Sequence, residues 1–213
     1  MIIFENQIKY CKICFEPIKD YSFHNLFVKN NELCEQCFSR FNAKFISFYV
    51  QSIKCIAIYE YNQKIKDLIF KFKGCYDIEL KDVFLARYIS FLRIKYCDFC
   101  LVPIPSNRID DERRGFNHVE MIYSGLKLPI LKVLEKTKNH KQAKSNIKLR
   151  INAQEYFKII DVDAVKNKKI LIVDDIYTSG SSVNAAINLI KQGKPKKIEV
   201  LVVAKSIDRK TKT

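Results

Sequence analysis

The spacing of hydrophobic positions along the chain changes several times, and each change marks a predicted element. Continuous or nearly continuous apolar runs, which are typical of strands buried on both faces, occur at 55–59, 99–104, 170–173 and 198–204. Apolar residues three and four apart, which are typical of helices packed on one face, recur at 39–52, 62–72, 78–95, 117–125 and 181–192. Weaker strand signals lie at 130–134 and 156–160.

The order of these elements predicts the fold class. From about residue 55 onward, strands alternate with helices, which favours an α/β fold with a parallel sheet flanked by helices. The polar segment 106–115 is predicted to be a turn. The basic segment 136–155 is predicted to be a loop or an exposed helix.

Composition narrows the class of protein. The 213 residues are 48% hydrophobic and 29% charged, which suits a folded core and argues against a largely disordered chain. No run approaches the roughly 18 consecutive apolar residues of a membrane-spanning helix, and the N-terminal residues lack the cleavage site of a signal peptide. We therefore expect a cytoplasmic protein without a transmembrane segment.

The charge balance adds a class of partner. Lys and Arg number 38 against 23 Asp and Glu, which gives a net charge of +15. Such an excess attracts nucleic acid, phosphorylated small molecules or an anionic membrane face. Charge alone does not choose among these three.

Two CxxC pairs stand near the N-terminus, 19 residues apart. Four thiolates at this spacing complete a tetrahedral Zn²⁺ shell, so the site would be structural and would supply folding energy. The predicted ligands are Cys11, Cys14, Cys34 and Cys37. Reduced thiol pairs or a redox couple are the alternative. We predict a zinc finger with the following helix at 1–52, in the position of a hood, and an α/β domain at 53–213.

A third pair, Cys97 and Cys100, has no second pair left to complete a metal shell, because Cys55 and Cys75 are isolated. It lies just before an apolar strand, where small thiols pack well. We interpret these cysteines as buried or partly exposed thiols, with a second metal or redox site as the alternative.

The strongest chemical pattern lies at 170–183, where an apolar strand leads into two carboxylates, a hydroxyl-rich turn and a helix. Open α/β sheets place ligands at the carboxyl ends of their strands. The turn and the helix N-terminus suit a phosphate, and paired carboxylates suit sugar hydroxyls or hydrated Mg²⁺. Two surface acids before a capped helix are the alternative interpretation.

This segment, Val173-Asp-Asp-Ile-Tyr-Thr-Ser-Gly-Ser-Ser182, resembles the signature with which type I phosphoribosyltransferases bind 5-phosphoribosyl-1-pyrophosphate (PRPP). The resemblance implies that Asp174 and Asp175 contact the ribose hydroxyls and that 178–182 holds the 5′-phosphate. It also implies Mg²⁺ as a cofactor. The implied PRPP-binding residues are Asp174, Asp175, Tyr177, Thr178, Ser179, Gly180, Ser181 and Ser182.

PRPP also carries a pyrophosphate, so it requires a second anion site. By the same resemblance, the loop after strand 99–104 contacts the pyrophosphate, and the planar fork of arginine suits that role. The candidates are Ser106, Asn107, Arg108, Arg113 and Arg114. A solvated basic turn is the alternative. Lys71 and Lys73 could add to the basic field, whereas the spacing of His118 and His140 indicates bystanders.

Five features follow one another in a specific order. They are the four cysteines, Ile69-Phe-Lys-Phe-Lys-Gly74, Val102-Pro-Ile-Pro105, Arg113-Arg-Gly-Phe-Asn117 and the PRPP signature. Their succession resembles the ComF (ComFC) family of competence proteins, which is associated with DNA uptake in natural transformation. In that family a zinc finger precedes a phosphoribosyltransferase domain.

The resemblance implies a protein that binds PRPP with Mg²⁺ and single-stranded DNA and assists DNA uptake, in contact with inner-membrane uptake machinery or peripherally at the inner face of that membrane. Lysines would neutralise phosphates, while Phe38, Phe41 and Phe45 are expected in the core rather than stacked on bases. Two alternatives stay open: a phosphoribosyltransferase acting on an unidentified nucleophile, and a PRPP sensor without chemistry. No catalytic residue is assigned.

Overall fold

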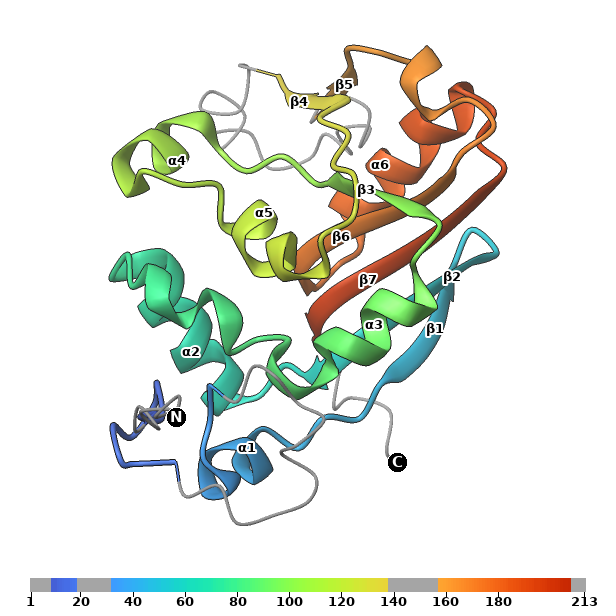
Figure 1. The fold of residues 1–213 in the computed structure, drawn as a ribbon. Helices are drawn as coiled ribbons and strands as arrows, with labels where there is room; N and C mark the ends of the chain where they lie inside the picture. Colours follow the sequence, from blue (N-terminus) through green and yellow to red (C-terminus); the bar gives the residue numbers. More distant parts are fainter. Residues whose placement is uncertain (1–8, 19–31, 138–156, 208–213) are drawn as a thin grey trace, which may run out of the picture.

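The computed structural model describes residues 9–18, 32–137 and 157–207. In this part of the chain, five strands form one sheet in the order β1-β2-β7-β6-β3, and β4 pairs with β5 in a separate ribbon (Figure 1). The strands are β1 (Ile46–Val50), β2 (Ile53–Glu60), β3 (Phe99–Pro103), β4 (Leu134–Lys136), β5 (Phe157–Ile159), β6 (Lys169–Tyr177) and β7 (Lys197–Lys205).

Helices connect and cover these strands. The α-helices are α1 (Glu35–Phe41), α2 (Gln63–Gly74), α3 (Ile89–Lys95), α4 (Arg108–Arg114), α5 (His118–Tyr123) and α6 (Ser181–Gln192). Short 3₁₀ turns are η2 (Ile78–Asp82), η3 (Ala86–Tyr88), η4 (Ser124–Leu126) and η8 (Asp163–Val165). No helix in the described ranges combines the length and the apolar character needed to cross a membrane.

The predicted parallel α/β sheet is confirmed. Strands β2, β7, β6 and β3 run parallel, and β1 is an antiparallel edge strand. Both faces of the sheet are covered, which explains why the central strands are nearly continuous apolar runs. Alternate residues of β6 join two different cores: Leu171 and Val173 pack with α2, α3 and α5, and Ile170 and Ile172 pack with α6.

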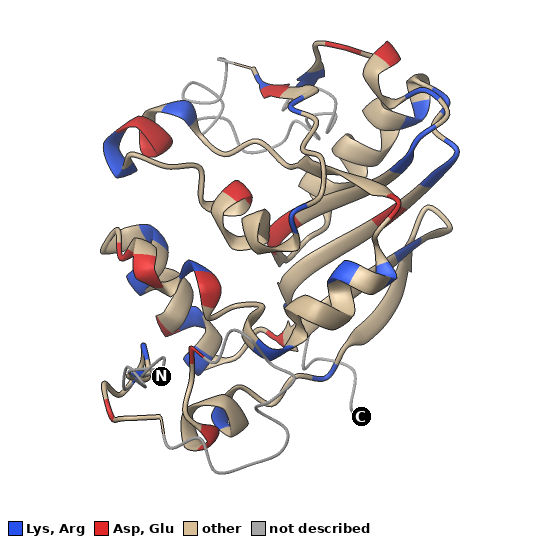
Figure 2. Ribbon diagram, in the orientation of Figure 1, with Lys and Arg blue, Asp and Glu red and all other residues tan. Residues whose placement is uncertain are grey.

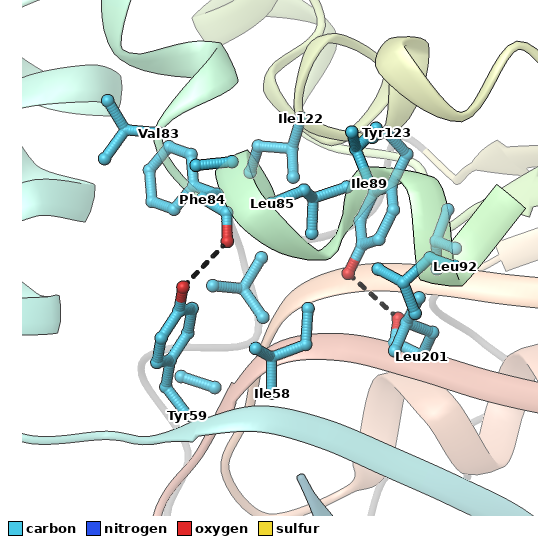
Figure 3. Packing of buried hydrophobic residues seen from close by; sticks show 14 of the residues in the cluster. Ile58, Tyr59, Val83, Phe84, Leu85, Ile89, Leu92, Ile122, Tyr123 and Leu201 are labelled. Carbon is cyan, nitrogen blue, oxygen red and sulfur yellow. Dashed lines mark hydrogen bonds between the residues drawn. The ribbon is translucent and has the colours of Figure 1, made fainter. Parts of the chain in front are cut away.

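Two buried tyrosines carry hydrogen bonds inside the first of these cores (Figure 3). The Tyr59 hydroxyl donates to the carbonyl oxygen of Phe84 at 3.1 Å, and the Tyr123 hydroxyl donates to that of Leu201 at 3.0 Å. A buried hydroxyl without a partner would be costly. These bonds therefore fix the segment before α3, and α5 itself, in defined places over the sheet.

The predicted helix 39–52 is wrong. Helix α1 ends at Phe41, and the next regular element is strand β1, not a continued helix. Asn42 and Phe45 both adopt positive φ angles of 46°, which a right-handed helix does not allow. Gln51 and Ser52 also have positive φ, as the two central residues of a tight hairpin turn require, and this turn pairs β1 with β2.

The continuous helix predicted over 78–95 is also wrong in part. Its first two thirds form the turns η2 and η3, and only Ile89–Lys95 is α-helical. Val83, Phe84 and Leu85 are all buried. A helix on the surface of a sheet buries only one stripe of residues, so three successive buried side chains require a tighter, irregular path.

The predicted turn at 106–115 is wrong because most of it is helix α4. Asn107 caps this helix, since its Oδ1 accepts the backbone N–H of Ile109 at 3.1 Å, and Gly115 ends it with φ of 80°. No residue of α4 is buried. A helix without a buried face has no apolar stripe, which explains why periodicity did not reveal it.

The remaining predictions vary in outcome. The strands at 55–59, 99–104, 156–160, 170–173 and 198–204 and the helices at 62–72, 117–125 and 181–192 are confirmed with small shifts at their ends. The strand predicted at 130–134 lies later, at β4, and Ile130 makes only an isolated bridge with Leu101. Most of the segment 136–155 lies outside the described residues.

Candidate functional site

Strand β6 carries the acidic pair at its carboxyl end, inside the sheet. It continues to Tyr177, so Asp174 and Asp175 are strand residues rather than part of the following turn. The Tyr123 hydroxyl lies 2.8 Å from the carbonyl oxygen of Asp174, and the Asp175 N–H donates to the Asp174 side chain at 2.9 Å. The strand, α5 and the local backbone therefore hold both carboxylates in place.

Asp175 is buried and has two partners from distant parts of the chain. Its Oδ2 lies 2.6 Å from Lys73 Nζ, at the end of α2, and 3.3 Å from His118 Nε2, at the start of α5. Burial alone would raise the pKa of Asp175, but the hydrogen bond from His118 and the charge of Lys73 lower it below its ordinary value. Asp175 is therefore ionised at neutral pH.

Asp174 is half-buried, and its neighbouring carboxylate, Asp175, is negatively charged. Burial and the negative charge of Asp175 raise the pKa of Asp174 well above its ordinary value. Lys73 offsets this effect only in part, because its ammonium group bonds Asp175. Asp174 is therefore the carboxylate whose charge is left for a cation or a hydrogen-bond donor to stabilise.

A polar network extends from Asp175 to α4. The Arg114 guanidinium lies 3.1 Å from His118 Nδ1, 3.1 Å from Asp111 Oδ1 and 3.2 Å from the carbonyl oxygen of Lys73. A guanidinium only donates, so Nδ1 accepts, and the neutral imidazole carries its proton on Nε2, toward Asp175. The interpretation of His118 as a bystander is wrong, because the fold brings it onto the acidic pair.

The five residues predicted for pyrophosphate fall into two groups. Ser106 bonds Asp111 and accepts from Asn117 at 3.0 Å, Asn107 caps α4, and Arg114 belongs to the network above. Arg108 and Arg113 are exposed on α4, and Arg108 pairs with Glu112 at 2.8 Å. Only these two arginines extend into solvent, so the pyrophosphate role stays a prediction.

The turn after β6 leads directly into α6. Gly180 adopts φ of 77° at the N-cap position, and a Cβ there would lie 2.4 Å from the Tyr177 hydroxyl oxygen. Helix α6 has no side-chain cap, and Thr178 and Ser179 are exposed in front of it. Uncapped N–H groups at the start of a 12-residue helix, beside exposed hydroxyls, suit an anion such as a phosphate.

The four N-terminal cysteines come together as the spacing predicts. Their Sγ atoms all lie within 4.8 Å of one another, and those of Cys14 and Cys34 are 3.7 Å apart. Four thiolates about 2.3 Å from a tetrahedral zinc would be roughly 3.8 Å apart, so a metal such as zinc fits this cluster. The other cysteines, at 55, 75, 97 and 100, lie outside it.

Local structure supports the cysteine cluster at both ends. Cys11 and Cys14 lie in a small turn closed by a bridge between Tyr10 and Pro17. Cys34 is the N-cap of α1, and its Sγ accepts the N–H of Cys37 at 3.5 Å. The cluster is therefore built partly on a helix start, where backbone N–H groups stabilise thiolates.

The cysteine-bearing segment packs on the first core. Cys11, Cys37 and Phe41 are buried within it, and the rings of Phe41 and Tyr59 meet edge to face at 6.2 Å. Phe38 and Phe45 pack against the same core, as expected for aromatics that do not stack on bases. The division of the chain into 1–52 and 53–213 stays a prediction.

Comparison with known proteins shows to which proteins this chain is similar. A family model described as "Phosphoribosyl transferase domain" matches residues 112–213, which include the acidic pair and the hydroxyl turn. Competence protein ComFC of Streptococcus pneumoniae (strain ATCC BAA-255 / R6) is 32% identical over 143 residues, 67% of this chain and 64% of the relative. ComFC of Bacillus subtilis (strain 168) is 29% identical over 153 residues, 70% of this chain and 63% of the relative.

The chain thus spans slightly less than two thirds of the length of these two relatives. Among solved structures, a hypoxanthine phosphoribosyltransferase from Staphylococcus aureus matches 62% of this chain and 67% of its own, with 11% identity and a TM-score of 0.37. That score is too low to support an argument. The two competence proteins and the domain that contains the acidic pair establish that this chain belongs to the ComFC family and carries a phosphoribosyltransferase domain.

Proposed function

We propose that this protein binds PRPP with Mg²⁺ and single-stranded DNA, and that it assists DNA uptake in natural transformation. The competence role is taken from the names of the two relatives. The observation that supports PRPP binding is the pairing of Asp174, at the end of β6, with the uncapped start of α6. Carboxylates and helix N–H groups at one sheet edge suit a phosphorylated sugar.

Within this proposal, the residues of the site have different tasks. Residues 178–182 hold the 5′-phosphate through backbone N–H groups and hydroxyls. Asp174 accepts hydrogen bonds from the ribose hydroxyls, and Mg²⁺ neutralises charge between the carboxylates and the pyrophosphate. Asp175 keeps its charge through Lys73 and His118, and its negative field favours the cation.

The proposed zinc ion has a structural task. Cys11, Cys14, Cys34 and Cys37 would fill all four positions of a tetrahedral shell, which leaves none for a substrate. Since the cysteine-bearing segment is short, metal binding would supply much of its folding energy. The metal would thereby hold Phe41 against the sheet.

Transfer of ribose 5-phosphate to an acceptor and PRPP sensing without chemistry use the same site. They differ from each other only in whether bound PRPP turns over. Neither is part of the proposal, because the described contacts support the binding of PRPP and suggest no acceptor.

The test of PRPP binding is calorimetry with PRPP and Mg²⁺ on the wild type and on Asp174→Asn. The substitution keeps the shape of the side chain and removes its charge, so we expect at least tenfold weaker binding, since charge-assisted hydrogen bonds contribute about 1.5–3 kcal/mol. Asp163→Asn changes the charge equally at an exposed position in η8 and should bind as the wild type does. Equal affinity in all three proteins would remove PRPP from the proposal.

A further inference from the structure

We propose that single-stranded nucleic acid binds at the amino ends of the parallel strands, on the edge of the sheet opposite the acidic pair. This inference rests on the single-strand binding proposed above and assigns its surface. We call this surface the amino-edge surface and define it by Tyr49, Lys54, Phe91, Lys95, Lys168, Lys169, Lys196 and Lys197. Figure 2 shows Lys and Arg gathered where β6 and β7 begin.

The lysines before and within β6 and β7 lie side by side. Lys169 and Lys197 are register partners at the starts of the two strands, and the Lys196 N–H donates to the carbonyl oxygen of Lys168 at 2.9 Å. The ammonium groups of Lys169 and Lys197 both lie 5.8 Å from the ring centroid of Phe99, at the start of β3. Three strand starts therefore share one basic cluster.

The cluster continues across α3 to the hairpin of β1 and β2. Lys95 lies at the end of α3, and its pKa is lowered, first by burial and then by the positive charge of Lys54. The negative charge of Glu199 acts in the opposite direction, and the positive charge of Lys197 lowers this pKa further. Such mutual repulsion requires the three ammonium groups to lie near one another. The structure thus places three positive charges near one another with Glu199 as a partial counter-charge, and an anion bound between them would reduce the remaining repulsion.

Among the described residues, four of these lysines form no ion pair, although Glu199 lies near Lys95 and Asp98 lies near Lys196. Lys169 pairs with Asp98, and Lys197 pairs with Glu199 at 2.7 Å. Within the described ranges, no carboxylate lies at ion-pair distance from Lys54, Lys95, Lys168 or Lys196. Four unpaired lysines on one edge provide sites for several successive phosphates.

Two exposed aromatic rings flank these lysines. Tyr49 is 71% exposed and lies directly opposite Lys54 in the ladder between β1 and β2, so both side chains project from the same face. Phe91 is 53% exposed, and Lys95 Nζ lies 5.8 Å from its ring centroid. Exposed rings beside unpaired cations suit unstacked bases followed by phosphates, which distinguishes a single strand from a duplex.

The opposite edge is unsuited to a phosphate chain without a metal, because Asp174 and Asp175 stand there. Along β6, five to six residue steps separate Lys169 from Asp174 and Asp175, which is roughly 17–20 Å at about 3.3 Å per residue. This separation exceeds the screening length of about 8 Å at physiological salt. A single strand and PRPP can therefore occupy different edges of the same sheet.

The test is fluorescence anisotropy with a labelled 20-nucleotide oligothymidine over a range of salt concentrations. We expect Lys54→Glu/Lys196→Glu to weaken binding at least tenfold. If both lysines contact phosphates, the slope of log affinity against log salt should become shallower by about 1.4, at about 0.7 per contact. The control Lys64→Glu/Lys66→Glu makes the same charge change on exposed residues of α2 and should have a much smaller effect.

The aromatic contribution is tested separately. Tyr49→Ala/Phe91→Ala should weaken oligothymidine binding at least fivefold and leave the salt slope unchanged, because stacking releases no counterions. PRPP calorimetry and thermal unfolding verify that each variant is folded.

The possible outcomes distinguish a wrong assignment of the amino-edge surface from a failure of the proposed single-strand binding itself. If the wild type binds no oligothymidine at 50 mM salt, single-strand binding itself is wrong. If the wild type binds and the two lysine variants weaken binding equally, then net charge alone drives it and the amino-edge assignment is wrong. If Lys54→Glu/Lys196→Glu loses binding to phosphatidylglycerol vesicles and keeps its affinity for oligothymidine, the surface is a membrane contact instead.

Discussion

Asp174 and Asp175 are neighbours in sequence, yet their surroundings give them opposite properties. Asp175 has a lowered pKa beside Lys73 and His118, whereas Asp174 has a raised pKa because it is half-buried beside a charged carboxylate. A raised pKa means that the ionised form of Asp174 destabilises the fold. This loss of folding stability is compatible with a binding site, because a bound cation or sugar hydroxyl would stabilise the ionised carboxylate of Asp174.

We therefore predict that Asp174→Asn stabilises the protein while it weakens PRPP binding. An Asp with a raised folded-state pKa stabilises the fold fully below its unfolded pKa of about 3.9 and loses that contribution as pH rises through its folded pKa. Asn removes the loss, so its advantage should be about 1 kcal/mol or more at pH 7 and should vanish below about pH 4. Urea unfolding at both pH values measures this, and a destabilised variant at pH 7 would contradict the assignment.

Ionised Asp175 stabilises the fold, whereas ionised Asp174 destabilises it. Its lowered pKa stabilises the fold above about pH 3.9, and that stability is lost as pH falls toward its folded pKa. Lys73→Met removes the cation that holds this carboxylate ionised. We expect the variant to be less stable at pH 7 and to lose less stability than the wild type on acidification below pH 4. Parallel unfolding curves across that range would show that the ion pair contributes nothing.

Gly180 and Gly115 separate two effects of a glycine. Both adopt positive φ, of 77° and 80°, but a Cβ on Gly180 would clash with Tyr177, and one on Gly115 would meet open space. Gly115→Ala should therefore cost about 1 kcal/mol for the left-handed backbone alone. We predict a clearly larger loss for Gly180→Ala in thermal unfolding. Equal losses would mean that the turn accommodates a methyl group beside Tyr177.

At the scale of elements, Cys34 belongs both to the cysteine cluster and to the start of helix α1. Cys34 is both a proposed metal ligand and the N-cap of α1, while Cys37, one turn later, is buried against the first core. The helix has only seven residues, which is too short to be stable alone. Its place on the sheet therefore depends on the cysteine cluster as well as on packing.

We predict that Cys34→Ser lowers bound zinc from one per chain toward none and loosens α1 and the segment around it. Loss of one thiolate leaves an incomplete shell, and metal binding is coupled to folding. Metal analysis and limited proteolysis measure the two effects. Cys97→Ser, at an exposed cysteine outside the cluster, should keep one zinc and resist proteolysis as the wild type does. Absence of zinc from wild-type protein purified without chelators would refute the site.

Helix α4 and helix α5 act together on the acidic pair. Arg114, at the end of α4, fixes His118, at the start of α5, and His118 in turn contacts Asp175. The Arg108 and Arg113 side chains project from the same α4. A ligand that moved α4 would therefore also move His118, which connects the proposed pyrophosphate contacts with the carboxylates.

At the scale of the whole molecule, the sheet has two chemically different edges. Its carboxyl edge carries Asp174, Asp175 and the start of α6, and its amino edge carries the unpaired lysines of the amino-edge surface. Lys169 and the two carboxylates lie roughly 17–20 Å apart along β6, and direct electrostatic effects over that distance are largely screened at physiological salt.

We predict that the two edges bind their ligands independently. Saturating PRPP and Mg²⁺ should change the affinity for oligothymidine by less than about threefold at physiological salt, because screening removes direct coupling. Anisotropy titrations with and without PRPP measure this, and Asp174→Asn serves as the control for effects of free PRPP and Mg²⁺ on the oligomer. A tenfold change in the wild type alone would require a conformational link between the edges.

The sequence alone determined what local pattern can determine. Continuous apolar runs identified the buried strands, CxxC spacing identified the cysteine cluster, and the order strand, acids, hydroxyls and helix identified the candidate site. The spacing of apolar residues gave wrong predictions for elements whose buried side chains do not form a single helical stripe. Helix α4 has no buried residue, and β1 carries aromatics that fit either spacing.

Tertiary structure decided the relations between distant residues. The contacts of Asp175 with Lys73, 102 residues before it, and with His118 arise because α2 and α5 pack on the same face of the sheet. These contacts lower one carboxylate's pKa while the neighbouring one is raised, and no spacing in the sequence encodes that difference. The gathering of lysines at the amino edge likewise depends on strand order, since β6 and β7 lie side by side only in the folded sheet.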